Sequence, residues 1–134
     1  MFQNREEAGK LLSQKLKFYK NSQNAVILAI PRGGVVVGRQ IAKILSIPLS
    51  IVVVKKLGAP QNPELAIGAI APSGVKYIDW DLVLRSGIEQ EYLDNKINEK
   101  SIEIKEREKK FEIKKSRNLG EYRIIILVDD GIAT

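Results

Sequence analysis

The sequence predicts an α/β fold with a parallel sheet at its core, formed by residues 1–134 as a single domain. A continuous apolar run at 25–30 and a mainly apolar stretch at 122–128 have the length and hydrophobicity of buried strands, and the first run suits a strand that is covered on both faces. Residues 31–54 add a glycine turn, a helix-compatible stretch and another short apolar run, an order typical of a βαβ unit. In such sheets, ligands bind where the loops leave the carboxyl ends of the strands.

A capping box predicts the first helix. Asn4 is followed three residues later by Glu7, so the Asn4 side chain can accept a bond from the Glu7 amide while the Glu7 side chain returns to the Asn4 amide. Apolar residues then recur at helical spacing from Ala8 to Tyr19. We therefore expect an amphipathic helix with one buried face.

Residues 55–79, here called the hood, combine a loop with a hairpin. Residues 55–64 carry two lysines, a glycine and two prolines, so we expect a mobile loop without regular structure. Apolar stretches at 66–71 and 75–79 flank a Pro-Ser-Gly turn and predict a β-hairpin.

One long charged helix is expected over residues 87–117. Opposite charges alternate along it at helical spacing, which indicates a solvated face and argues against a nucleic-acid surface. An apolar seam at heptad spacing consists of Ile97, Ile104 and Phe111. This seam packs either on its own domain or on a second copy, so a homodimer is one of the arrangements it allows.

Composition excludes several classes of chemistry. The chain has no cysteine and no histidine, which removes disulfides, thiolate nucleophiles, serine–histidine triads and histidine metal sites. No apolar run approaches the ~20 residues that span a bilayer, and the N-terminus lacks a signal-peptide pattern, so we expect a cytoplasmic protein without a membrane partner. The net charge of +6 favours anionic partners, which could be phosphorylated metabolites or nucleic acid.

Two adjacent carboxylates follow the last predicted strand. Asp129 and Asp130 come directly after the apolar run, and the loop after them contains Gly131, Ile132, Ala133 and Thr134. Carboxylates at a strand end can accept hydrogen bonds from two neighbouring hydroxyl groups of a ligand, directly or through magnesium, and small loop residues let backbone amides close around a phosphate. The alternative is an acidic turn after an ordinary core strand.

Two further turns carry cationic groups. After the first strand, Gly33 and Gly34 remove the Cβ atoms that would block an anion from the backbone amides, and Arg32 adds a forked cationic donor. After the second strand, Lys55 and Lys56 could neutralise a phosphate group, although lysines at a strand end are as often solvated.

These motifs resemble those of type I phosphoribosyltransferases. The string from Ile124 to Thr134 is similar to the family's phosphoribosyl pyrophosphate signature. The wider pattern resembles a bacterial and archaeal subgroup of predicted phosphoribosyltransferases whose acceptor is not settled. That pattern comprises Phe2-x-x-Arg5-x-Glu7-Ala8-Gly9, the 31–34 turn and the stretch from Lys56-Leu57-Gly58 to Gly68-Ala69. The resemblance covers nearly the whole chain.

The resemblance implies a magnesium-dependent pentosyltransferase of nucleotide metabolism. Such an enzyme transfers the 5-phosphoribosyl group from phosphoribosyl pyrophosphate to a nitrogenous base or related acceptor and releases pyrophosphate. Asp129 and Asp130 would hold the ribose and, through the ribose or water, the Mg²⁺ ion. Residues 131–134 would bind the 5-phosphate. Ala133 stands where hypoxanthine-type enzymes have an aspartate, so this loop looks closer to the adenine type.

In the same family the turn after the first strand binds pyrophosphate, often through a cis peptide that would correspond here to Pro31–Arg32. Arg32 and the amides of Gly33 and Gly34 would take this role. A lysine of the hood, Lys55 or Lys56, would neutralise the departing pyrophosphate. Gly58 and Glu64 are candidate residues of the flexible part of the hood.

The resemblance also implies a partial fold. In the family, Thr134 would be followed by a glycine, a hydroxyl residue, a helix facing the phosphate and further strands. We therefore expect this form to end inside the ligand loop and to be impaired. Two other functions stay open, namely a ligand-binding regulator without catalysis, which would respond to phosphoribosyl pyrophosphate or a nucleotide, and an assembly module built on the apolar seam.

Overall fold

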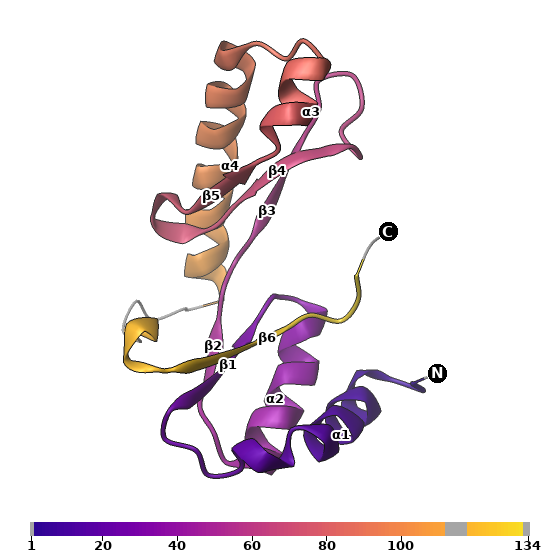
Figure 1. The fold of residues 1–134 in the computed structure, drawn as a ribbon, viewed down its shortest axis with the longest axis vertical. Coiled ribbons are helices and arrows are strands. Elements are labelled where there is room, and N and C mark those ends of the chain that lie inside the picture. Colours follow the sequence, from indigo (N-terminus) through magenta and orange to yellow (C-terminus); the bar gives the residue numbers. More distant parts are fainter. Residues whose placement is uncertain (1, 112–117, 133–134) are drawn as a thin grey trace. The chain divides into compact units, whose positions relative to one another are not determined.

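The computed structural model describes residues 2–111 and 118–132, and the chain divides into two compact units. The first unit comprises Met1–Val52 and Lys114–Thr134, and the second comprises Val53–Ile113. Each unit has its own cluster of buried apolar side chains. Figure 1 labels the helices and strands.

A parallel three-stranded sheet forms the centre of the first unit, which confirms the predicted fold class. Its strands are β1 (Ala25–Ala29), β2 (Leu49–Ile51) and β6 (Ile124–Val128), in the order β2-β1-β6. Four of the five residues of β1 are buried, which agrees with its continuous apolar sequence. The prediction of strands in these runs was correct, although β2 ends at Ile51 and β6 starts two residues later than expected.

Two helices pack in succession beside this sheet (Figure 1). Helix α2 (Gly33–Leu45) buries the predicted apolar face against the strands, with Val37, Ile41 and Leu45 almost fully covered. Helix α1 (Arg5–Lys15) packs on α2, and the short 3₁₀ turn η1 (Lys17–Tyr19) follows it. The two helices approach closely at Gly9, where a methyl group would lie 2.9 Å from the carbonyl oxygen of Val37.

The predicted cap of α1 is half correct. The Asn4 side chain accepts a bond of 2.8 Å from the Glu7 amide, as expected. The Glu7 carboxylate, however, accepts from the amide of Gln3 and not from that of Asn4. The backbone of Asn4 is fully extended, so the preceding residue presents the amide that Glu7 reaches.

The second unit contains an antiparallel sheet in the order β3-β4-β5. The hairpin is confirmed as β4 (Ala66–Ile70) and β5 (Lys76–Ile78), joined through the 3₁₀ turn η2 (Pro72–Gly74). The prediction that residues 55–64 lack regular structure was wrong at its start, because β3 (Lys55–Gly58) pairs with β4. Leu57 is fully buried there, and both prolines lie beyond the strand.

Two helices, α3 (Trp80–Arg85) and α4 (Gln90–Lys110), complete this unit. The long charged helix is confirmed, but it begins three residues later than predicted, after Gly87 with its positive φ of 62°. Residues 112–117, where its predicted end falls, lie outside the described part of the chain. Helix α3 was not predicted, and the Asp79 side chain caps it by accepting a bond of 3.0 Å from the Leu82 amide.

The apolar seam of α4 is used within its own unit. Ile104 is 2% exposed, and Ile97 packs partly buried against the same cluster. Phe111, just after the helix, is half-buried. The seam therefore serves the core of the second unit.

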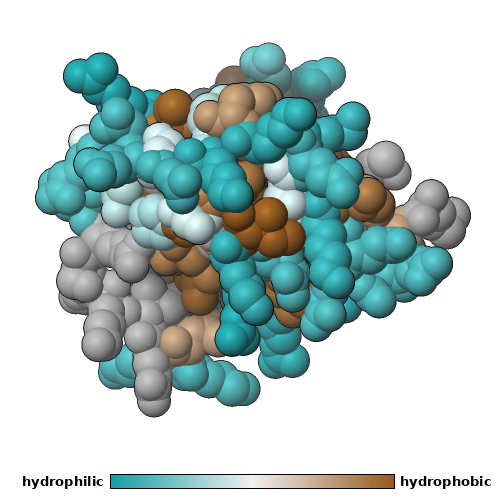
Figure 2. All heavy atoms as spheres, turned by 90° about the horizontal axis from the view of Figure 1, so that it is seen from below, coloured by the Kyte–Doolittle hydropathy of each residue, from teal (hydrophilic) through white to brown (hydrophobic). Residues whose placement is uncertain are grey.

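The remaining described element is the 3₁₀ turn η3 (Leu119–Glu121), which precedes β6. Among the helices that the structure describes, none combines the length and apolar character needed to cross a membrane. Figure 2 shows one face of the molecule, on which hydrophilic residues predominate and smaller apolar patches lie between them.

Candidate functional site

The glycine turn and the acidic pair leave the sheet of the first unit at the same edge. Strands β1 and β6 run parallel, with Ala29 beside Val128. The Ile30 amide donates a bond of 2.9 Å to the carbonyl oxygen of Val128, which continues the pairing by one residue. The residues that follow the two strands, 31–34 and 129–130, therefore begin side by side.

Glycine is needed at two positions of the turn because the acidic pair lies against it. A methyl group on Gly33 would collide with the Asp130 carboxylate and lie 2.6 Å from Nε of Arg5. One on Gly34 would lie 2.7 Å from the Val128 carbonyl oxygen and 2.9 Å from Cα of Asp129. The preceding Pro31–Arg32 peptide is cis, as the resemblance implied.

An arginine from α1 contacts the acidic pair. Arg5 donates to one oxygen of Asp130, Oδ2, from Nε at 2.9 Å and from a terminal guanidinium nitrogen at 2.6 Å. This guanidinium holds the pKa of the Asp130 carboxyl below its usual value. Sequence reasoning did not select Arg5 as a site residue. Two signals were available, namely its place in the Phe2-x-x-Arg5 motif and its position as a cation in the first turn of a helix, where the dipole favours anions.

The two carboxylates keep one oxygen each for a ligand. Oδ1 of Asp129 accepts a bond of 2.8 Å from the Asp130 amide, and Oδ2 of Asp130 is taken by Arg5. Within residues 2–111 and 118–132, no protein donor bonds to Oδ2 of Asp129 or to Oδ1 of Asp130. Two acceptors on neighbouring residues can hold two adjacent hydroxyl groups.

An open hollow adjoins this edge. Its volume is about 800 Å³, and Arg5 and the two aspartates form its charged side. The rest of its lining is mainly apolar or uncharged and comes from the start of the chain and from α1 and α2: Phe2, Gln3, Asn4, Ala8, Leu12, Val36 and Val37, together with the acidic Glu6. The site thus combines a charged edge with an apolar wall.

The other predicted residues of the first unit are placed as follows. Arg32 is exposed and lies immediately before α2, at its N-cap position. Gly131 and Ile132 are exposed beyond the acidic pair. Ala133 and Thr134 lie outside the described residues.

The predicted lysines belong to the second unit, and each is paired with a carboxylate. Nζ of Lys55 lies 3.1 Å from Oε2 of Glu103 on α4. Nζ of Lys56 lies 3.3 Å from both Oε2 and the carbonyl oxygen of Glu64. Gly58 was expected in a flexible loop but ends β3, where a methyl group would lie 2.9 Å from Cα of Pro63.

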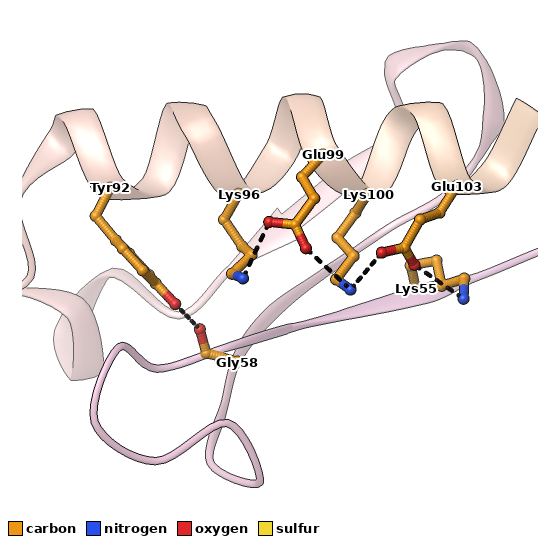
Figure 3. Close-up of polar contacts among 7 residues, drawn as sticks. All are labelled: Lys55, Gly58, Tyr92, Lys96, Glu99, Lys100 and Glu103. Atoms are coloured by element: carbon orange, nitrogen blue, oxygen red, sulfur yellow. Dashed lines mark hydrogen bonds and ion pairs between the residues drawn. The ribbon is translucent and has the colours of Figure 1, made fainter.

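Figure 3 shows how Lys55 joins a chain of ion pairs along α4. Lys100 contacts Glu103 at 2.8 Å and Glu99 at 3.6 Å, and Lys96 contacts Glu99 at 3.1 Å. The hydrogen bond from Lys100 lowers the pKa of Glu103, and the bond from Lys55 lowers it by a smaller amount. The Tyr92 hydroxyl donates a bond of 2.8 Å to the Gly58 carbonyl at the other end of this row.

Comparison with known proteins identifies a family for this arrangement. The model of the phosphoribosyl transferase domain matches residues 2–134. Two Mycobacterium tuberculosis proteins, from strains CDC 1551 / Oshkosh and ATCC 25618 / H37Rv, are each 39% identical over 134 residues, and their names assign them provisionally to the phosphoribosyl transferases. The chain spans 30% of the length of these two relatives.

A solved structure is also similar to this chain. The crystal structure of TT1426 from Thermus thermophilus matches with a TM-score of 0.76 and 32% sequence identity. The match covers 97% of this chain and 61% of TT1426.

Proposed function

Because this chain belongs to the phosphoribosyl transferase domain family, we propose that it binds phosphoribosyl pyrophosphate between the glycine turn and the acidic pair. We propose further that the whole protein transfers the 5-phosphoribosyl group to a nitrogenous acceptor. The observation that carries the proposal is the contact of Gly33 and Gly34 with Asp129 and Asp130, which sets anion-binding backbone beside paired carboxylate acceptors.

In this proposal each part of the ligand has its own partners. The open oxygens of Asp129 and Asp130 accept hydrogen bonds from the two ribose hydroxyls. The pyrophosphate lies at the start of α2, where amides near Gly33 and Gly34 point outward and the dipole of a 13-residue helix favours anions. Arg32, exposed at the same helix end, supplies a planar cationic donor.

The reaction then depends on positioning and charge. The bond between C1 of the ribose and the pyrophosphate oxygen breaks, and its electron pair leaves with pyrophosphate. The acceptor nitrogen forms the new bond to C1 from the opposite face, and the proton that this nitrogen loses passes to the released pyrophosphate or to solvent. The Asp129–Asp130 pair orients the ribose throughout, while the α2 N-terminus and the cationic side chains stabilise the charge that develops on the leaving group.

The donor set fits a magnesium ion that is shared with the ligand. Among the described residues there is no group of three or more acidic side chains that could hold a metal by itself. Mg²⁺ is commonly bound by one or two carboxylates together with substrate phosphates and water, which matches an adjacent aspartate pair. When bound, the ion would neutralise phosphate charge, and Asp129 and Asp130 would hold it through water or through the ribose.

Calorimetric titration tests the binding step. We expect phosphoribosyl pyrophosphate to bind in the presence of Mg²⁺, and Asp129→Asn and Asp130→Asn each to weaken binding by about tenfold or more, since each loses a charged hydrogen bond. Asp81→Asn is the matched control, because Asp81 is exposed on α3. Undiminished binding by both aspartate variants would contradict the proposed site.

Pyrophosphate release tests the reaction. The whole protein, to which the transfer reaction is assigned, is incubated with Mg²⁺, phosphoribosyl pyrophosphate and a panel of nitrogenous bases, and pyrophosphate is measured by a coupled assay. Acceptor-dependent release that Asp130→Asn abolishes supports transfer. Binding without release for any base would favour the regulator that the sequence left open.

A further inference from the structure

The first residue of α1 is a cation in a position that ordinarily favours an anion. Arg5 begins the helix, ahead of Glu6 and Glu7. The positive end of the helix dipole lies there, so a guanidinium gains nothing from the helix itself. Arg5 instead contacts Asp130, 125 residues away in the sequence.

The backbone that carries Arg5 is held in place. Asn4 caps the helix, and Ala8 and Gly9 are buried in the packing of α1 on α2. Helix α2 in turn begins at Gly33, whose missing side chain makes room for both the Asp130 carboxylate and Nε of Arg5. Two segments that are distant from Asp130 in the sequence, the start of α1 and the glycine turn, thus meet its carboxylate.

The geometry of the contact decides which oxygen of Asp130 remains open. Both donated bonds, at 2.9 and 2.6 Å, end on Oδ2. A carboxylate held twice through one oxygen cannot turn freely, so Oδ1 keeps one place in the described structure. Asp130 precedes Gly131, in an exposed stretch of loop after the last sheet residue, and its backbone alone would not provide that constraint.

We propose that Arg5 is a positioning residue of the ligand site, which acts on the ribose through Asp130. The proposal rests on the proposed function, because it assigns to Arg5 the orientation of a carboxylate that is useful only if Asp130 binds the ligand. In this proposal Arg5 acts through the two donors that it gives to Asp130 and does not itself contact the ligand.

A double-mutant cycle separates this role from direct binding of the ligand by Arg5. Phosphoribosyl pyrophosphate with Mg²⁺ is titrated into the wild-type protein, Arg5→Met, Arg5→Lys, Asp130→Asn and the double variant Arg5→Met/Asp130→Asn. The asparagine in Asp130→Asn keeps one acceptor oxygen, so we expect this variant to bind the ligand weakly and not to lose binding altogether. Its affinity is therefore measured at high ligand concentration. Lys10→Met is the matched control, because Lys10 is an exposed cation on the same helix.

We expect Arg5→Met to weaken binding about tenfold and Arg5→Lys to weaken it less, while Lys10→Met leaves it within about twofold. In the Asp130→Asn background, Arg5→Met should change the affinity by less than about twofold, because the carboxylate it positions is gone. Melting temperatures of all single variants should stay close to wild type, since Arg5 is exposed.

Three outcomes would overturn the proposal, and they are distinguishable. Absence of wild-type binding removes the proposed function together with this role. Normal binding by Arg5→Met removes only the role of Arg5. A tenfold loss that persists in the Asp130→Asn background shows that Arg5 acts on the ligand directly and not through Asp130.

Discussion

Alanine at Gly33 and alanine at Gly34 should have different consequences, although the two residues are neighbours. At Gly34 the new methyl group would meet backbone atoms, the Val128 carbonyl oxygen at 2.7 Å and Cα of Asp129 at 2.9 Å. Backbone at the end of a paired strand cannot move aside cheaply. At Gly33 the methyl group would meet the ends of two side chains, Asp130 and Arg5, which can swing outward.

The magnitudes follow from those contacts. Overpacking against backbone costs about 1–3 kcal/mol, and replacing glycine in a helix returns about 0.5–1 kcal/mol. Because a methyl group on Gly34 would meet two backbone atoms within 3.0 Å, the overpacking term lies in the upper half of that range, about 2–3 kcal/mol. The Gly34→Ala substitution should therefore lower the free energy of unfolding by about 1–2.5 kcal/mol, or the melting temperature by roughly 4–9 °C. Gly33→Ala loses an exposed ion pair worth about 0.5 kcal/mol. It gains a similar amount because alanine has a higher helix propensity than glycine, so the free energy of unfolding should be nearly unchanged.

The assay combines denaturant unfolding with titration of phosphoribosyl pyrophosphate. Gly33→Ala should keep the wild-type unfolding midpoint and lose about tenfold in affinity because Asp130 is displaced. Gly34→Ala should lose both. Gly131→Ala is the control for stability, because a methyl group at Gly131 meets no atom within 4 Å. Equal stability of the Gly34→Ala and wild-type proteins would contradict the predicted clash with the backbone. A loss of stability in Gly33→Ala that matches the loss in Gly34→Ala would contradict the predicted difference between the two positions.

Two further predictions concern the second unit. Ile104→Ala should lower the free energy of unfolding by about 2–5 kcal/mol because it leaves a cavity at a buried position. Ile102 is exposed, so Ile102→Ala should change this free energy by no more than about 0.5 kcal/mol. Both are measured by denaturant unfolding, and equal effects would contradict the assignment of the seam to the core. Glu103→Gln should cost about 0.5 kcal/mol at pH 7. Lys100 and Lys55 lower the pKa of Glu103 in the folded state. The difference in stability between the wild-type and Glu103→Gln proteins should therefore be present above about pH 4.3 and disappear as the pH falls through the folded pKa. A stability difference that is unchanged at low pH would show that the ion pairs are not its cause.

Elements with a strong local pattern were predictable from the sequence. Continuous apolar runs marked β1 and β6, and the spacing of Val37, Ile41 and Leu45 marked α2. The edge where the glycine turn meets the acidic pair also followed from the sequence, because the loops after parallel strands open on the same side.

The elements that were missed have physical reasons. Strand β3 contains two lysines and a glycine, and it exists through pairing with β4 and the burial of Leu57, which a local pattern does not show. Helix α3 has six residues, too few for a clear periodicity, although Asp79 was available as a cap. The contact of Arg5 with Asp130 joins the two ends of the chain, so no local spacing could reveal it.

The lysines illustrate the difference between a residue type and its surroundings. Lys55 and Lys56 were selected as cations after a strand, and the structure shows each already paired, with Glu103 and Glu64 respectively. Each ammonium group is therefore neutralised by a carboxylate of its own unit. The Lys56–Glu64 pair is exposed and contributes about 0–1 kcal/mol, whereas Lys55 and Glu103 are half-buried.

Amide mapping by nuclear magnetic resonance with phosphoribosyl pyrophosphate and Mg²⁺ tests the proposed ligand site. We expect the largest chemical-shift changes at the amides of Gly33, Gly34 and Asp130, with small changes when the ligand is replaced by free ribose. Shifts confined to residues away from the β1 and β6 ends, with those three amides unmoved, would contradict the central claim that the glycine turn and the acidic pair form one ligand site.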